Sequence, residues 1–318
     1  MARIMIFKEV NQPRIIYMGT PEISAYVLSS LIEHGYNVVA LISNEDKEVG
    51  RKRILEATPT KKVALAHNIK VYQPKSIRKD NDFIKELEPD VIITFAYGKI
   101  VPLEVLNAPK YGCINLHGSL LPKYRGAAPM QRAIMAGEKK TGVTLMEMVE
   151  AMDAGKMFDK EEFPIEEDDN YTSICEKMEK AAEKLILKDL LPYLNGELKG
   201  IEQKEDEVAF ADKIKPEEEK LDLNLPISSF INMVRGLSLT PGGYLYLDGE
   251  KVKIFSMRKI NDNVNHELGE IISDKKHFII QLNGGEAEIT SLQPAGKKMM
   301  DGASFLNGSH SLLGKRFA

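Results

Sequence analysis

The sequence predicts an α/β protein with two domains, in which a mostly parallel sheet covered by helices is followed by a small antiparallel β-barrel. Three observations support this prediction. Short apolar runs alternate with helical segments from residue 14 onwards, which is typical of a parallel sheet. Tight-turn signals separate short β-rich runs beyond residue 240. The 318 residues are enough for two domains of ordinary size.

The first half of the chain alternates strands and helices in a Rossmann-like manner. Short, mostly apolar runs predict strands at residues 15–18, 38–42, 70–72, 91–95 and 112–116. Thr20 and Pro21 suit the N-cap and the first position of the helix after the first strand, and Gly35 suits its end. Further helices are expected at residues 60–67, 82–87 and 174–194.

The pattern beyond residue 217 changes to short strands joined by tight turns. Asp-Gly at 248–249 and Asn-Gly-Gly at 283–285 are hairpin signals, and β-rich runs flank both. Several short strands within about 100 residues indicate a small antiparallel barrel, here expected to be OB-like. We therefore expect a first domain at 14–200, a charged linker at 201–216 and a barrel domain at 217–318.

Composition is that of an ordinary globular protein that can bury a core, with 43% apolar residues, 28% charged residues and a formal net charge of −4. No apolar run approaches the roughly 18 residues of a membrane span, and the first ten residues lack the core of a secretory signal. We therefore expect a cytoplasmic protein without membrane contact. Two cysteines and scattered histidines favour neither disulfides nor a metal site. No domain is strongly basic, so a nucleic acid would be contacted by local patches.

The residues most suited to chemistry lie at the end of a predicted strand, in CINLHGSLLP (113–122). Asn115 and His117 are two residues apart and therefore share one face of the strand. The carboxyl end of a parallel strand opens onto the usual ligand crevice. An asparagine amide can donate to a developing oxyanion, and a histidine can move a proton near neutral pH. Spacing alone leaves open that backbone groups satisfy both side chains in a structural role.

Longer motifs resemble those of the 10-formyltetrahydrofolate-dependent formyltransferases. They are NLHGSLLP (115–122), RGAAP (125–129) and MDAG (152–155). Further motifs are similar to those of the members that act on initiator tRNA: RIIYMGTP (14–21), AYG (96–98), QR (131–132) and SLQPAGKK (291–298). The resemblance departs at SLTP (238–241), where the family usually shows NPWP, and this chain has no tryptophan.

The resemblance implies transfer of a formyl group from 10-formyltetrahydrofolate, a cosubstrate, to the α-amino group of methionine on initiator tRNA, for translation initiation. Asn115 would stabilise the oxyanion, His117 would manage protons, and Asp153 would hold His117. The resemblance also implies a folate site beside the strand that ends near residue 95 and the SLLP loop. Its residues would be Phe95, Tyr97, Gly98, Ile100, Ser119, Leu120, Leu121 and Pro122.

Residues 44–62, NEDKEVGRKRILEATPTKK, form an unusually long connection between a strand and the next helix. Composition alone favours a charged surface loop. The resemblance instead implies a basic loop that enters the tRNA acceptor arm, with Arg51, Lys52 and Arg53 at its tip. Lys297 and Lys298 would add phosphate contacts from the barrel domain, which would position the tRNA. We expect a monomer and no metal.

Three other functions fit parts of the pattern. A formyltransferase acting on a sugar nucleotide or on glycinamide ribonucleotide would keep Asn115, His117 and Asp153. A formyltetrahydrofolate hydrolase would use water in place of the amine, and its carboxyl-terminal half would differ. A catalytically silent RNA-binding protein could keep the fold and the basic loop, although the three intact polar residues argue against it.

Overall fold

A computed structural model of the chain describes residues 12–50, 53–273, 276–307 and 312–318. Its contacts divide the chain into two compact units. The first holds the described residues up to Ala127, together with Thr141–Phe163 and Cys175–Ala211, and the second holds Ala128–Lys140, Pro164–Ile174 and the described residues from Asp212 to Ala318. The predicted division into a first domain at 14–200, a linker at 201–216 and a barrel domain at 217–318 stays a prediction.

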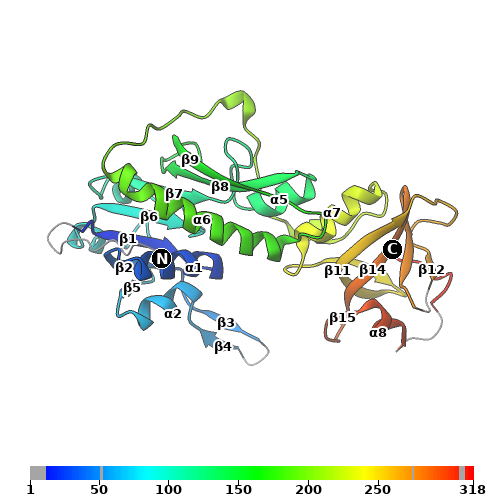
Figure 1. Cartoon of the computed structure of the whole chain (residues 1–318). Coiled ribbons are helices and arrows are strands. Elements are labelled where there is room, and N and C mark those ends of the chain that lie inside the picture. Colours follow the sequence, from blue (N-terminus) through cyan, green and yellow to red (C-terminus); the bar gives the residue numbers. More distant parts are fainter. Residues whose placement is uncertain (1–11, 51–52, 274–275, 308–311) are drawn as a thin grey trace. The chain divides into compact units, whose positions relative to one another are not determined.

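The first unit contains a seven-stranded sheet with the order β5-β2-β1-β6-β7-β8-β9 (Figure 1). Its strands are β1 (Ile15–Gly19), β2 (Val38–Ile42), β5 (Lys70–Tyr72), β6 (Val91–Phe95), β7 (Cys113–His117), β8 (Lys140–Glu147) and β9 (Met157–Pro164). The first five are parallel, and β8 runs antiparallel to β7. All residues of β1 and β6 are buried, as expected of central strands covered on both faces. The mostly parallel sheet is confirmed, whereas β8 and β9 were not predicted.

Helices of the first unit follow the predicted pattern, with local differences. They are α1 (Glu22–Glu33), α2 (Pro59–Ala66), α3 (Phe83–Glu86), α4 (Leu103–Leu106) and most of α6 (Tyr171–Leu194). The predicted cap of α1 is wrong by one residue. Pro21 takes the N-cap position, and the Thr20 hydroxyl instead accepts a hydrogen bond from the Asn44 amide at 3.2 Å. Gly35 follows α1 with a φ of 78°, as predicted.

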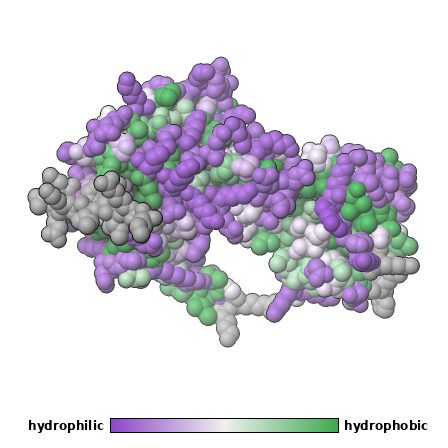
Figure 2. Space-filling model, viewed as in Figure 1, coloured by the Kyte–Doolittle hydropathy of each residue, from purple (hydrophilic) through white to green (hydrophobic). Residues whose placement is uncertain are grey.

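The long connection after β2 contains a hairpin that the sequence analysis did not predict. Strands β3 (Lys47–Val49) and β4 (Ile54–Glu56) pair antiparallel on either side of a turn that begins with Gly50, whose φ is 71°. The apolar side chains of Val49, Ile54 and Leu55 are exposed on the hairpin, and Figure 2 shows hydrophobic surface there.

The second unit packs an antiparallel sheet of order β10-β11-β14-β13-β12 against α7 (Ile227–Leu237), with β15 paired to β14. The strands are β10 (Gly243–Leu247), β11 (Glu250–Asn261), β12 (Ile271–Ser273), β13 (Ile279–Leu282), β14 (Gly285–Pro294) and β15 (Met300–Asp301), and the remaining helices are α5 (Pro129–Met135) and α8 (Gly302–Asn307). Short 3₁₀ turns lie at Glu205–Glu207, in the first unit, and at Pro216–Glu219.

The predicted barrel is closed by the carboxyl-terminal residues. The Ala318 amide donates to the Tyr246 carbonyl of β10 at 2.8 Å, and the Phe317 amide donates to the Gly269 carbonyl, just before β12, at 2.9 Å. These residues therefore join the two edges of the sheet. The Phe317 ring packs against Phe278 in the core of this unit.

Candidate active site

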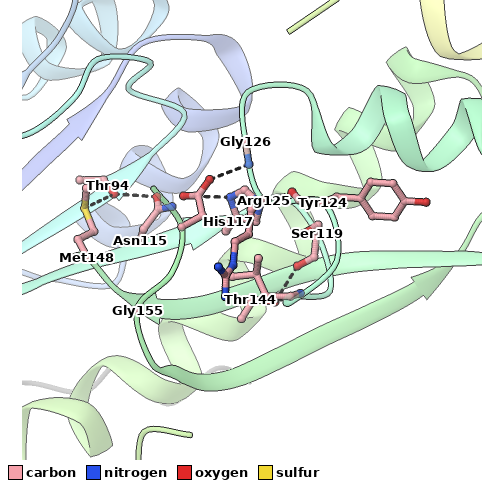
Figure 3. Close-up of polar contacts among 12 residues, drawn as sticks. Thr94, Asn115, His117, Ser119, Tyr124, Arg125, Gly126, Thr144, Met148 and Gly155 are labelled. Atoms are coloured by element: carbon pink, nitrogen blue, oxygen red, sulfur yellow. Dashed lines mark hydrogen bonds and ion pairs between the residues drawn. The ribbon is translucent and has the colours of Figure 1, made fainter. Parts of the chain in front are cut away.

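Asn115 lies at the carboxyl end of β7, beside Thr94 of the parallel strand β6 (Figure 3). The Thr94 hydroxyl donates to Asn115 Oδ1 at 2.7 Å and also lies 3.1 Å from the sulfur of Met148. The contact with Thr94 orients the Asn115 amide. Within the described part of the chain, no acceptor takes a hydrogen bond from Asn115 Nδ2, so this donor is available to a ligand at the strand end.

His117 lies two residues further along the same face and is only 5% exposed. Its Nε2 atom lies 2.9 Å from the Tyr124 carbonyl oxygen. Because a carbonyl only accepts hydrogen bonds, Nε2 carries the proton in neutral His117. Nδ1, which lies 3.6 Å from Asp153 Oδ1, therefore presents a lone pair. The contact with Tyr124 thus makes Nδ1 the atom of His117 that can accept a proton.

Asp153 lies in the loop between β8 and β9, with a φ of 51°. Its Oδ2 atom accepts from the Gly126 amide at 2.9 Å, a hydrogen bond that Figure 3 draws as a dashed line ending at Gly126. Two residues later, Gly155 packs so closely that a Cβ would lie 2.0 Å from the Glu147 carbonyl oxygen. The structure therefore brings the three predicted catalytic residues together near the carboxyl end of β7.

The first group of residues predicted to bind folate follows β6. Phe95 and Tyr97 are buried, whereas Gly98 and Ile100 are exposed, Ile100 by 76%. Burial raises the pKa of Tyr97 to about 12, so its hydroxyl stays neutral. Gly98 has a φ of 77°, and open space surrounds the position where a Cβ would lie. Gly98 and Ile100 are thus the members of this group that a ligand can reach.

The second predicted folate group is the SLLP loop after β7. The Ser119 hydroxyl donates to the Lys123 carbonyl at 2.7 Å, and the Leu121 amide donates to Thr144 Oγ1 at 3.1 Å. Ser119 and Leu121 are buried by these contacts, while Leu120 and Pro122 are half-buried. Hydrogen bonds within this loop and to Thr144 of β8 therefore hold the loop in one shape.

The residues predicted to contact tRNA are separated in the sequence. Arg51 and Lys52 lie outside the described residues. Arg53 begins the second half of the hairpin with a φ of 49°, and its guanidinium lies 2.9 Å from the Glu48 carboxylate. Lys297 and Lys298 are exposed after β14, in the second unit.

The sequence analysis did not predict individual roles for several residues around the site. Arg125 is buried, and its guanidinium donates to Gln203 Oε1 at 2.9 Å and pairs with Glu205. Thr94 could have been found as the polar residue of an otherwise apolar strand, and Arg125 and Gly126 lie in the quoted RGAAP motif. Gln203 lies in the charged stretch IEQKEDE, which offers no such signal.

The described part of the chain offers neither a candidate metal site nor a candidate membrane-spanning helix. There, no group of three or more histidine, cysteine, aspartate or glutamate residues could hold a metal ion. No described helix is both long enough and apolar enough to cross a membrane.

Comparison with protein families assigns both halves of the chain. The formyl transferase model matches residues 13–190, and the model of the formyl transferase C-terminal domain matches residues 213–310. The chain therefore belongs to the formyl transferase family, which confirms the resemblance.

Curated relatives narrow this assignment. The chain is 42% identical to the methionyl-tRNA formyltransferase of Bacillus subtilis (strain 168), over 93% of this chain and 95% of the relative. It is 39% identical to the enzyme of the same name from Lactobacillus gasseri, over 93% of this chain and 96% of the relative. Within the family, the chain thus groups with the methionyl-tRNA formyltransferases.

Solved structures share the fold at lower identity. The N-formyltransferase from Helicobacter canadensis, in complex with folinic acid and dTDP-3-aminofucose, matches with a TM-score of 0.67 and 18% identity, over 89% of this chain and all of that one. HypX from Aquifex aeolicus, in complex with tetrahydrofolic acid, also matches with a TM-score of 0.67 and 18% identity, over 97% of this chain and 51% of that one.

Proposed function

We propose that this chain transfers the formyl group of 10-formyltetrahydrofolate to the α-amino group of methionine carried by initiator tRNA. The observation that carries the proposal is the cluster of Asn115, His117 and Asp153 at the end of β7, with His117 Nδ1 3.6 Å from Asp153 Oδ1. It occurs in a chain that is 39% and 42% identical to two methionyl-tRNA formyltransferases over nearly its whole length.

Asn115 is suited to stabilise the charge that develops during this transfer. A free α-amino group has a pKa of about 7.7–8.0, so a useful fraction of the amine is neutral and nucleophilic at physiological pH. As its lone pair forms a bond to the formyl carbon, the formyl oxygen becomes an oxyanion. Asn115 Nδ2, whose orientation is set by the hydrogen bond from Thr94, donates to that oxyanion.

His117 is suited to move the proton that the attacking amine must lose. Its Nδ1 lone pair accepts this proton, and the resulting imidazolium still donates from Nε2 to the Tyr124 carbonyl. The Asp153 carboxylate stabilises the imidazolium at 3.6 Å. The proton then passes to the folate nitrogen as its bond to the formyl carbon breaks, so His117 ends in its starting state and no metal takes part.

The substrates are proposed to use the two remaining groups of predicted residues. Folate would lie along the segment of Phe95, Tyr97, Gly98 and Ile100 and against the SLLP loop, and it would contact the exposed Gly98 and Ile100 directly. The tRNA would be contacted by Arg51, Lys52, Arg53, Lys297 and Lys298. We further propose that the protein acts as a monomer in the cytoplasm.

The deciding experiment is transfer of a radiolabelled formyl group from 10-formyltetrahydrofolate to charged initiator tRNA. Charged elongator tRNA and free methionine serve as parallel acceptors, and we expect label on the initiator tRNA far in excess of both. An amino sugar nucleotide and glycinamide ribonucleotide test the related transferases, and release of free formate tests the hydrolase. Preferential labelling of any of these, or release of formate without transfer, would contradict the proposal.

A further inference from the structure

A buried amide connects two loops of the proposed active site. Gln203 is 8% exposed, and both hydrogens of its Nε2 are donated to carbonyl oxygens of the loop that carries Asp153. One goes to the carbonyl of Asp153 itself at 2.7 Å, and the other goes to that of Gly155 at 2.8 Å. The Gln203 Oε1 atom accepts from the Arg125 guanidinium at 2.9 Å.

The hydrogen bonds of Gln203 act on Asp153 through its backbone and, by way of Arg125, on the loop that binds its carboxylate. Arg125 precedes Gly126, whose amide donates to Asp153 Oδ2 at 2.9 Å. Gln203 therefore links the backbone of Asp153 to Arg125. Arg125 is the neighbour of Gly126, whose amide binds the Asp153 carboxylate. Because the Asp153 φ of 51° is uncommon for a residue with a Cβ, the surrounding contacts must hold this conformation.

The segment that carries Gln203 is itself fixed against the RGAAP loop. We call residues 203–211 the strap. The Arg125 amide donates to the Ala209 carbonyl at 2.9 Å, and the Ala211 amide donates to the Arg125 carbonyl at 2.7 Å. A Cβ on Gly126 would lie 2.7 Å from the Ala211 carbonyl oxygen, so the strap passes directly over this glycine. Although the sequence suggested a linker here, residues 203–211 pack within the first unit.

We propose that Gln203 is a positioning residue for formyl transfer, whose amide fixes the backbone of Asp153 and thereby the approach of the Asp153 carboxylate to His117. The inference rests on the proposed function. Gln203 acts through Asp153 rather than on the substrates, because its three hydrogen bonds all go to Asp153, Gly155 and Arg125.

The principal test is Gln203→Glu, which keeps the size of the side chain and its acceptor for Arg125 but removes both donors. We expect kcat to fall on the order of 10²-fold, since small misplacements of catalytic groups have effects of this size, while the KM values for folate and tRNA stay within about twofold. Glu202→Gln, at a neighbouring exposed position, is the matched control and should behave like the parent. Parental kcat in Gln203→Glu would overturn the proposal.

A double-mutant cycle separates positioning from a general loss of structure. In an Asp153→Asn background, Gln203→Glu should cause no further loss of kcat, because the group through which it acts is already disabled. Multiplicative losses would show that Gln203 acts independently of Asp153 and would overturn the inference. Gln203→Asn, which is one methylene shorter and uncharged, provides a second variant if Gln203→Glu does not fold, and we expect it to lower kcat about tenfold.

A spectroscopic measurement tests the inference without relying on catalysis. The ring ¹H–¹⁵N signals of His117 should move in Gln203→Glu in the same direction as in Asp153→Asn, and they should be unchanged in Glu202→Gln. Unchanged His117 signals in folded Gln203→Glu would refute the positioning role. If the parent does not formylate initiator tRNA, the proposed function fails, whereas this measurement still tests the link from Gln203 to His117.

Discussion

The Asp153 loop, between β8 and β9, and the β3–β4 hairpin, between β2 and α2, are both connecting segments of the first unit, but they are built in opposite ways. The Asp153 carboxylate accepts from the Gly126 amide at 2.9 Å, and the Asp153 carbonyl accepts from buried Gln203 at 2.7 Å. The hairpin instead leaves Val49 and Ile54 exposed by 50% and 64%, and its ion pair between Arg53 and Glu48 lies at the surface.

This difference matches the work that each segment is proposed to do. Groups that stabilise a transition state are effective only when they are already held in place, since the entropic cost of ordering them would otherwise add to the activation barrier. A segment that contacts a large substrate can stay uncovered, because the substrate covers it on binding. At the base of the hairpin, Lys61 Nζ of α2 donates to Asp46 Oδ2 at 2.6 Å and so links the hairpin to the first unit.

The largest effects should come from the buried side of this comparison. We expect Asn115→Ala to lower kcat by about 10²–10³-fold, as is typical when one oxyanion donor is removed, and His117→Ala to lower kcat by about 10²–10⁴-fold, because the proton acceptor is lost. The double variant should lose little more than either single variant, because such residues act as a unit. Steady-state formylation kinetics would measure this, with exposed Asn195→Ala as the control. Independent, multiplicative losses would argue against a joint catalytic unit.

The hairpin should show a smaller effect, confined to tRNA. We expect Arg51→Ala to raise the KM for initiator tRNA about tenfold, the size of one lost charged contact, and to leave folate binding unchanged. Arg51→Lys should restore only part of the affinity, because an ammonium group lacks the planar fork of guanidinium. Kinetics at fixed salt would measure this, with exposed Arg78→Ala as the control. Equal tRNA kinetics for Arg51→Ala and the parent would remove the proposed role of the hairpin tip.

Thr94 tests whether orientation of the oxyanion donor matters apart from its presence. Thr94→Val keeps the shape of the side chain but removes the hydroxyl that donates to Asn115 Oδ1 at 2.7 Å. We expect kcat to fall about fivefold, corresponding to one net hydrogen bond, with unchanged KM values. Unaltered kcat in a folded variant would mean that the backbone alone orients Asn115.

The strand pattern and the pairing of Asn115 with His117 could be predicted because both are local. Apolar runs indicate buried strands, and the two-residue period of a strand places both side chains on one face. Asp153 could be added only through the family resemblance, since it lies on a different loop. The hairpin was missed because β3 and β4 have three residues each, too few to show a period, and charged residues dominate β3.

Gln203 shows where prediction from one sequence ends. Its partners Gly155, Asp153 and Arg125 are 48, 50 and 78 positions away in the chain. Local periodicity carries no information about contacts over such separations. The composition around Gln203 favours an exposed charged linker, and only the fold shows that this side chain is buried beside the site.

The smallest effect should come from a buried carboxylate outside the proposed active site, one of whose oxygens has no hydrogen-bond partner among the described residues. Asp189 of α6 is buried, and its Oδ2 atom has no hydrogen-bond partner among the described residues. Burial raises the pKa of Asp189 to about 6. The folded state therefore favours the protonated form, so the stability that Asp189 contributes is present below the unfolded pKa of about 3.9 and is lost as the pH rises through about 6.

Asp189→Asn, which cannot ionise, should therefore raise the Tm by about 2–4 °C at pH 8 and by about half as much at pH 5, with kcat unchanged. Thermal unfolding at the two pH values would measure this, with exposed Asp80→Asn as the control. An equal shift at both pH values would mean that the charge of Asp189 is compensated, for which Lys188 Nζ at 3.6 Å is the nearest candidate. In that case, the Asp189 carboxylate would be stabilised in its charged form, as the Asp153 carboxylate is by the Gly126 amide, and the contrast between the two carboxylates would not hold.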